Sequence, residues 1–164
     1  MLGVDPGTAT TGIAFVRELP DGSYESVHYG VVLTEAGRPM PLRLKSLYRQ
    51  LTILIETYQP DHAAIEELFF GKNITTAITV AQGRGVALLA MANAGLSIRE
   101  FTPAEVKQTI AGYGNAPKAQ MQQMVTTLLK LDKIPKPDDA ADALAIALTG
   151  LQYRQWEDLT GEQA

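Results

Sequence analysis

Four acidic side chains stand where secondary structure could bring them to one place. Asp5 follows an apolar, strand-forming run that a Pro-Gly pair ends, and Glu66 ends a second such run. Asp139 and Asp142 are three residues apart in an alanine-rich run, so in a helix they leave from neighbouring positions on one face. A carboxylate on rigid backbone at the edge of a sheet suits a metal ligand. The pattern therefore indicates a metal site if these elements converge.

Each acid also has an ordinary explanation. An Asp before a Pro-Gly pair, as at Asp5, often caps a turn with its own side chain, and Glu66 can be a solvated acid. The dipole of a helix favours acids in its first turn, which accounts for Asp138 and Asp139. We expect Asp138, directly after a proline, to be the N-cap. The dipole explains Asp142 poorly, because that residue lies on the second turn beside the apolar stripe.

The chemistry changes if the acids share one edge of a sheet. Like charges gathered so closely raise one another's pKa and destabilise the fold unless cations lie between them. A ligand set of carboxylate oxygens, without His or Cys, favours Mg²⁺ or Mn²⁺ over zinc. Two such ions about 4 Å apart can activate an attacking water and stabilise the leaving oxygen of a phosphodiester. Convergence of the acids would therefore predict phosphoryl-transfer chemistry.

Length and composition limit the class of protein. The 164 residues suffice for one domain, and no apolar run reaches membrane-spanning length. Cysteine is absent, which excludes a disulfide framework and a thiol nucleophile and agrees with a soluble, cytoplasmic protein. The formal charge of −4 argues mildly against nucleic-acid binding. Two divalent ions would add four positive charges, however, and would bring that total to zero.

Hydrophobic periodicity and turn residues predict the elements that position the acids. Short β-prone runs between turn residues indicate strands, and apolar residues at helical spacing indicate helices. The predicted strands are 2–4, 12–19, 24–33, 62–66 and 96–101, and the predicted helices are 44–58, 74–94, 103 to near 112, 118–129 and 138–153. This order predicts an α/β fold with a mixed five-stranded sheet flanked by helices on both faces.

Several short motifs occur in a fixed order along the chain. They are Gly3-Val4-Asp5-Pro6-Gly7, Ala64-Ile65-Glu66-Glu67 followed by Phe69, Val106-Lys107-Gln108, Lys118, and Asp139-Ala140-Ala141-Asp142-Ala143-Leu144-Ala145. Together they resemble the RuvC family of bacterial Holliday-junction resolvases, from Leu2 to about Gly150. The resemblance implies a ribonuclease-H-like nuclease domain over residues 1–153, and we expect a polar, flexible tail over 154–164.

The resemblance also implies the roles of the acids and the reaction. Asp5, Glu66, Asp139 and Asp142 correspond to the family's catalytic acids, which hold Mg²⁺, with Mn²⁺ as a substitute and two ions per active site. The implied enzyme is a homodimer that cuts two strands of a four-way DNA junction symmetrically and leaves 5′-phosphate and 3′-hydroxyl ends. It would act in recombination and DNA repair beside the RuvAB branch-migration complex. The helix that carries Gly83 and Gly85 either forms the dimer contact or is buried within one subunit.

Residues that would hold DNA surround these acids. The predicted set is Phe69, Phe70, Lys72, Arg84, Lys107 and Lys118. Two adjacent aromatics in a loop cannot both face the core, and an exposed Phe that stacks on an unpaired base contributes roughly 1–3 kcal/mol. The resemblance favours Phe69 for stacking and leaves Phe70 open between core and DNA. It also selects Lys107 and Lys118 as phosphate ligands, with Lys72 and Arg84 as weaker additions.

Three other interpretations compete with this one. Asp5-Pro6-Gly7-Thr8 with Gly12 also resembles the first phosphate loop of actin-like ATPases, but the second phosphate loop and the adenosine motif are missing from the sequence. A ribonuclease-H-fold nuclease that acts on RNA, or as a monomer, is a nearer alternative. A DNA-binding module without catalysis would have no use for four converging acids.

Overall fold

The sheet has the predicted mixed topology. The structure is a computed structural model that describes residues 1–68 and 74–161, the side chains of 74–76 excepted. Its strands are β1 (Leu2–Asp5), β2 (Thr10–Glu18), β3 (Tyr24–Leu33), β4 (His62–Glu66) and β5 (Ser97–Phe101), in the spatial order β3-β2-β1-β4-β5. β1 pairs antiparallel with β2 and parallel with β4, so the acids that end β1 and β4 share one edge.

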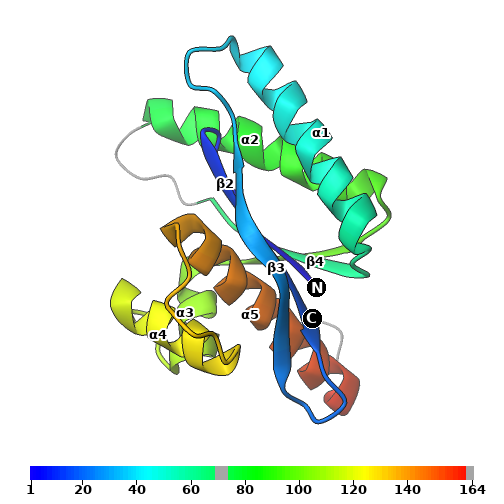
Figure 1. Cartoon of the computed structure of the whole chain (residues 1–164), viewed down its shortest axis with the longest axis vertical. Coiled ribbons are helices and arrows are strands. Elements are labelled where there is room, and N and C mark those ends of the chain that lie inside the picture. The colour runs from blue at the N-terminus through cyan, green and yellow to red at the C-terminus, as the bar shows by residue number, and fades with distance from the viewer. Residues whose placement is uncertain (69–73, 162–164) are drawn as a thin grey trace.

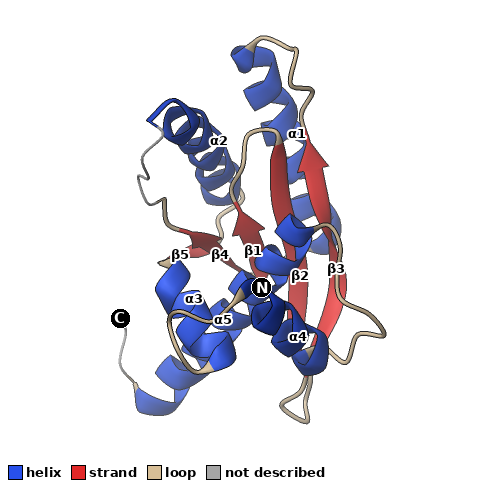
Figure 2. Cartoon of the chain, turned by 90° about the vertical axis from the view of Figure 1, so that its left-hand side faces the viewer, coloured by secondary structure: helices blue, strands red, loops and turns tan. Residues whose placement is uncertain are grey.

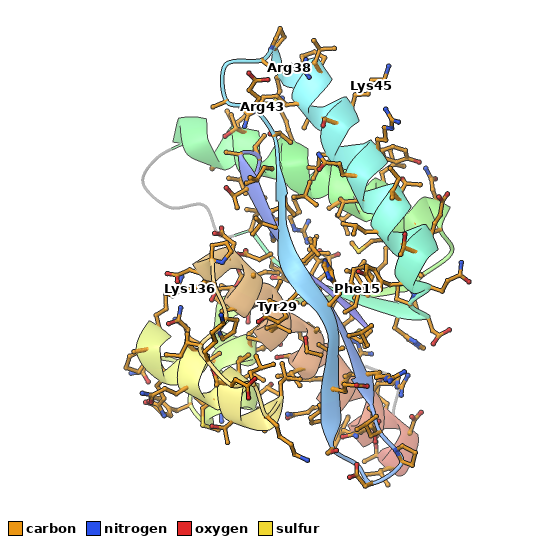
Figure 3. All side chains as sticks on the ribbon, in the orientation of Figure 1. Phe15, Tyr29, Arg38, Arg43, Lys45 and Lys136 are labelled. Carbon is orange, nitrogen blue, oxygen red and sulfur yellow. The ribbon has the colours of Figure 1, made fainter. Side chains whose placement is uncertain are left out.

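Helices cover both faces of this sheet (Figures 1 and 2). They are α1 (Met40–Tyr58), α2 (Ile74–Asn93), α3 (Pro103–Ala111), α4 (Lys118–Leu128) and α5 (Asp138–Thr160). α1 and α2 pack on one face and α5 on the other, with α3 and α4 outside α5. The labelled side chains of Phe15 and Tyr29 mark the two faces: Phe15 belongs to the cluster with α1, and Tyr29 packs against the cluster with α5 (Figure 3).

The backbone of α5 lies directly on the two central strands. A Cβ atom at Gly3 of β1 would stand 2.2 Å from the carbonyl oxygen of Ala143, and one at Gly12 of β2 would stand 2.0 Å from that of Asp139. Any side chain larger than hydrogen would therefore push the helix away from the sheet. A glycine within a strand often marks such a close backbone approach.

The predicted end of the last helix, at Tyr153, is wrong. α5 continues to Thr160, where Gly161 in the left-handed conformation ends it, so residues 154–160 of the expected flexible tail are helical. Polar contacts rather than an apolar stripe hold this extension: Arg99 forms an ion pair with Glu157, and the Tyr24 hydroxyl donates to Gln155 Oε1 at 3.0 Å. Hydrophobic periodicity cannot register contacts of this kind.

The start of α3 confirms the predicted capping box. The side chain of Thr102 accepts a hydrogen bond from the backbone amide of Glu105, and the Glu105 carboxylate accepts one from the amide of Thr102. This reciprocal pair fixes where α3 leaves β5, and α3 carries Lys107.

Within the described residues, no helix combines the length and the apolar character needed to cross a membrane.

The contact between α5 and β1 gives a stability prediction. Gly3→Ala should lower the free energy of unfolding by about 1–3 kcal/mol, because its methyl group would overlap the backbone of α5. Gly37→Ala is the matched control, since a Cβ there meets no atom of the described residues within 4 Å. Urea unfolding of both variants checks this, and equal midpoints would contradict the close packing.

Candidate active site

β1 and β4 carry two of the acids to the same edge of the sheet. Val4 pairs with Ile65 in the parallel register, so Asp5 and Glu66 follow side by side at the carboxyl ends of their strands. The three residues before each acid are buried, which fixes the backbone that holds these two carboxylates. Strand ends at such an edge are a common position for ligand and catalytic groups in α/β proteins.

α5 brings the other two acids to that edge. The carbonyl of Asp139 lies over Gly12, which is the residue that pairs with Asp5 across β1 and β2. Asp142 stands one turn further along the helix. The side chain of Asp is short, so it reaches the ends of the strands only because the helix backbone lies directly on the sheet.

A cavity of about 280 Å³ opens between these elements. Its lining residues are Asp5, Glu66, Pro103, Val106, Lys107, Lys118, Met121, Asp142, Ala145 and Ile146. The polar side chains in this lining are three acids and two lysines, and α3, α4 and α5 supply an apolar wall. Asp139 is not among the lining residues, although its charge acts on Asp5.

Burial and mutual repulsion make the acids reluctant to ionise together. Burial, and then the charges of Glu66, Asp142 and Asp139, raise the pKa of Asp5 from 3.8 to about 7. Burial and the charge of Asp142 likewise raise the pKa of Glu66, against the opposing effect of Lys107. Burial also raises the pKa of Asp142, although Lys118 beside it favours the charged form. Bound cations would therefore relieve the electrostatic repulsion between these carboxylates.

The donor set fits a hard divalent cation. Carboxylate oxygens are the ligands that Mg²⁺ and Mn²⁺ prefer, and three of them line one cavity. In the present rotamers, no group of three or more His, Asp or Glu side chains within the described residues has the geometry of a finished metal site. Asp142 instead accepts a hydrogen bond from Lys118 Nζ at 3.1 Å, so an ion would replace the ammonium as its partner.

Comparisons with known proteins identify the family of this chain. The model of the family described as crossover junction endodeoxyribonuclease RuvC matches residues 1–150. The chain belongs to the RuvC family. A RuvC from Brevibacillus brevis is 51% identical over 155 residues, which cover 94% of this chain and 92% of that one. A RuvC from Chloroflexus aggregans is 57% identical over 147 residues, which cover 90% and 89%.

Solved RuvC structures confirm the ribonuclease-H-like fold class. Thermus thermophilus RuvC in complex with a Holliday junction substrate superposes with a TM-score of 0.89 at 32% identity and covers 94% of each chain. The yeast mitochondrial Holliday junction resolvase Ydc2 superposes with a TM-score of 0.73 at 14% identity, over 97% of this chain and 80% of that one. At that identity the likeness concerns the fold alone.

The structure of this RuvC-family chain corrects the prediction for Asp138. Pro137 is the N-cap of α5 and Asp138 is the first helical residue, without a capping hydrogen bond from its side chain. Its carboxylate accepts hydrogen bonds from Lys136 Nζ at 2.8 Å and from Gln122 at 3.0 Å, which lower its pKa to about 2. Figure 3 shows Lys136 beside the beginning of α5. Nearby side-chain donors, rather than backbone amides, therefore satisfy this acid.

The residues predicted to bind DNA lie in different surroundings. Lys107 and Lys118 line the cavity, and Lys118 Nζ also lies 3.4 Å from Asp138 Oδ2. The Nε of Arg84 donates to the carbonyl oxygen of Glu66 at 3.0 Å, so this side chain is bound to the protein itself. The remaining predicted residues, Phe69, Phe70 and Lys72, lie outside the described residues.

Sequence reasoning missed the role of Gly12. This glycine was expected to begin a strand and was part of the resemblance to a phosphate loop, yet it provides the space in which the backbone of Asp139 rests. A glycine inside a β-prone run was the available signal. Glu100 of β5, which forms an ion pair with Arg84, was also missed, and its surroundings in the sequence give no sign of that partner.

The raised pKa of Asp5 gives a pH prediction for the metal-free protein. The folded chain holds this proton more tightly than the unfolded chain, so stability should fall as the pH rises from about 4 to about 7. Asp5→Asn removes the effect and should raise the free energy of unfolding at pH 8 by about 2–4 kcal/mol, with little change at pH 4.

Urea unfolding in EDTA at several pH values measures this difference. Asp132→Asn, which removes an exposed acid of the same type, is the control and should follow the wild-type profile. Identical profiles for wild type and Asp5→Asn would show that Asp5 carries no such penalty.

Proposed function

We propose that this chain is a metal-dependent endodeoxyribonuclease that resolves four-way DNA junctions in recombination and repair. The observation that carries the proposal is one cavity lined by Asp5, Glu66 and Asp142 together with Lys107 and Lys118, in a chain of the RuvC family. Carboxylates suit the ions that hydrolyse phosphodiesters, and lysines suit the phosphates of the substrate. The Thermus thermophilus relative, which has been solved with a Holliday junction substrate, supports the choice of DNA.

Different residues of this chain would bind the metal ions and the DNA phosphates during strand cleavage. Asp5, Glu66, Asp139 and Asp142 would hold Mg²⁺ or Mn²⁺, two ions per site, which supply an activated water and stabilise the leaving 3′-oxygen. Lys107 would hold a backbone phosphate at the mouth of the cavity. Lys118 would exchange its hydrogen bond with Asp142 for a phosphate contact when the acids take up their ions. The products would carry 5′-phosphate and 3′-hydroxyl ends.

A homodimer supplies the second cut. Resolving a junction needs two hydrolytic sites, and the described residues of one chain form one cavity lined by these acids. α2 offers a contact surface: Ile78 and Leu89 are 54% and 52% exposed, and they lie on the same face as Gln82 and Gly85. A Cβ at Gly85 would meet no atom of the described residues within 4 Å, so a second helix could approach there. Gly83, by contrast, packs within the chain against Gly7.

The wider setting follows from the same proposal. A junction resolvase works in the cytoplasm, where bacterial DNA lies, and we place the RuvAB branch-migration complex among its partners. Phe69, three positions after Glu66 in the sequence, remains the proposed base-stacking residue, and Phe70 and Lys72 remain proposed DNA contacts.

The acids give the direct test of the chemistry. Glu66→Gln should abolish Mg²⁺-dependent cutting of a synthetic four-way junction while the dissociation constant for that junction changes little, because the carboxylate binds metal rather than DNA. Asp132→Asn is the control with the same change of charge on an exposed surface. A linear duplex and an RNA–DNA hybrid in parallel separate junction resolution from other nuclease activities. Wild-type cutting by Glu66→Gln would exclude the proposed site.

The dimer has its own test. Leu89→Glu should shift the protein from dimer to monomer in sedimentation equilibrium at micromolar concentration, since it places a charge on the exposed face of α2. Leu159→Glu is the matched control, because Leu159 is 86% exposed on α5. A wild-type protein that sediments as a monomer under cutting conditions would contradict the homodimer.

A further inference from the structure

One stretch of α2 contacts the ends of both acid-bearing strands. The hydroxyl of Thr8, in the turn after β1, donates a hydrogen bond to the carbonyl of Thr79. One turn later, a Cβ at Gly83 would stand only 3.1 Å from the carbonyl oxygen of Gly7. Figure 1 shows α2 beside the end of the sheet at which β2 begins. The helix therefore abuts the turn that directly follows Asp5.

The next residue of α2 holds the end of β4. Arg84 Nε donates to the carbonyl oxygen of Glu66 at 3.0 Å, and its Nη2 forms an ion pair with Glu100 of β5. The backbone amide of Glu67 donates to the carbonyl of Phe101 at 2.8 Å. The peptide group that joins Glu66 to Glu67 is thus held from two sides, through its carbonyl by α2 and through its amide by β5.

The same contacts remove Arg84 from the DNA-facing surface. Its side chain is only 15% exposed, and two of its three nitrogens have partners in the protein. A phosphate ligand needs an accessible cationic group, which Lys107 and Lys118 supply at the cavity. A carbonyl oxygen at the end of a strand, by contrast, needs a donor to replace the sheet hydrogen bonds that stop there.

We propose that Arg84 is a positioning residue, which fixes the end of β4 against α2 so that the Glu66 carboxylate stands at the correct separation from Asp5. It acts through Glu66 and contacts neither DNA nor the reacting phosphate. The inference deepens the proposed nuclease function and rests on it. Catalytic constellations tolerate displacements of only about 0.5 Å, so a strand end freed from this contact should lose activity.

Four variants separate this role from its alternatives. Arg84→Met keeps the length of the side chain and removes both contacts, whereas Arg84→Lys keeps the charge and should restore part of the activity. Glu100→Gln removes the ion pair but leaves the hydrogen bond to Glu66, so it should lose less activity than Arg84→Met. Arg17→Met is the matched control, because Arg17 forms an ion pair with Glu25 between β2 and β3 in which both side chains are exposed.

Single-turnover cutting of a four-way junction at saturating enzyme gives the first readout. Arg84→Met should lower this rate on the order of 10- to 100-fold, as small displacements of reacting groups do. Its dissociation constant for the junction, measured without divalent metal, should stay within about threefold of wild type. A rate that recovers fully at higher enzyme concentration, together with an equally weakened dissociation constant, would make Arg84 a DNA ligand and overturn the proposal.

Metal binding gives a readout that does not depend on cutting. Added Mn²⁺ should raise the thermal unfolding midpoint of wild type and of Arg17→Met, and it should raise that of Arg84→Met by clearly less. An equal rise in all three would overturn the positioning role, even if Arg84→Met were less stable overall. Should wild type fail to cut junctions, the proposed function fails, while the Mn²⁺ effect still decides whether Arg84 organises the acids. A wild-type rate of cutting by Arg84→Met would refute the positioning role and leave the proposed nuclease function intact.

Discussion

The close packing of the α5 backbone on the central strands is the constraint on which the site depends. Gly3 and Gly12 give the helix room, and its alanines keep the interface thin, so the carbonyl of Asp139 rests where a side chain of β2 would otherwise stand. Asp side chains are too short to span the usual separation of about 10 Å between packed layers. Only this contact lets acids more than 130 residues apart in sequence meet at the edge of the sheet.

The assembled site trades stability for chemistry. Burial and repulsion between neighbouring carboxylates raise the pKa of Asp5 to about 7, and Lys118 is the only cation hydrogen-bonded to Asp142 within the described residues. Divalent ions remove the repulsion and are also the groups that cleave phosphodiesters. The same unfavourable electrostatics would therefore favour binding of such ions. The net charge of −4, which disfavours DNA, would also be offset by such ions, since two of them would bring it to zero.

The sequence allowed most of the framework to be predicted, because strands and helices here follow apolar periodicity and clear turn residues. Asp5 and Glu66 could be placed at strand ends for the same reason, and the capping box at Thr102 began α3 as expected. The failures came from contacts between distant residues. Asp138 is not the N-cap, and its carboxylate is instead hydrogen-bonded to Lys136 and Gln122. The helix α5 extends beyond Tyr153, where Arg99 and Tyr24 bind its last turns. The partners of Arg84, Glu66 and Glu100, could not be predicted either, because nothing in the local sequence reveals them.

Manganese located by anomalous diffraction in crystals of the protein tests the central claim most directly. The account predicts Mn²⁺ peaks about 2.0–2.2 Å from carboxylate oxygens of Asp5, Glu66 and Asp142, and their loss in crystals of Asp5→Asn. Mn²⁺ found only at other surfaces, or unchanged at this edge when Asp5 is replaced, would contradict it.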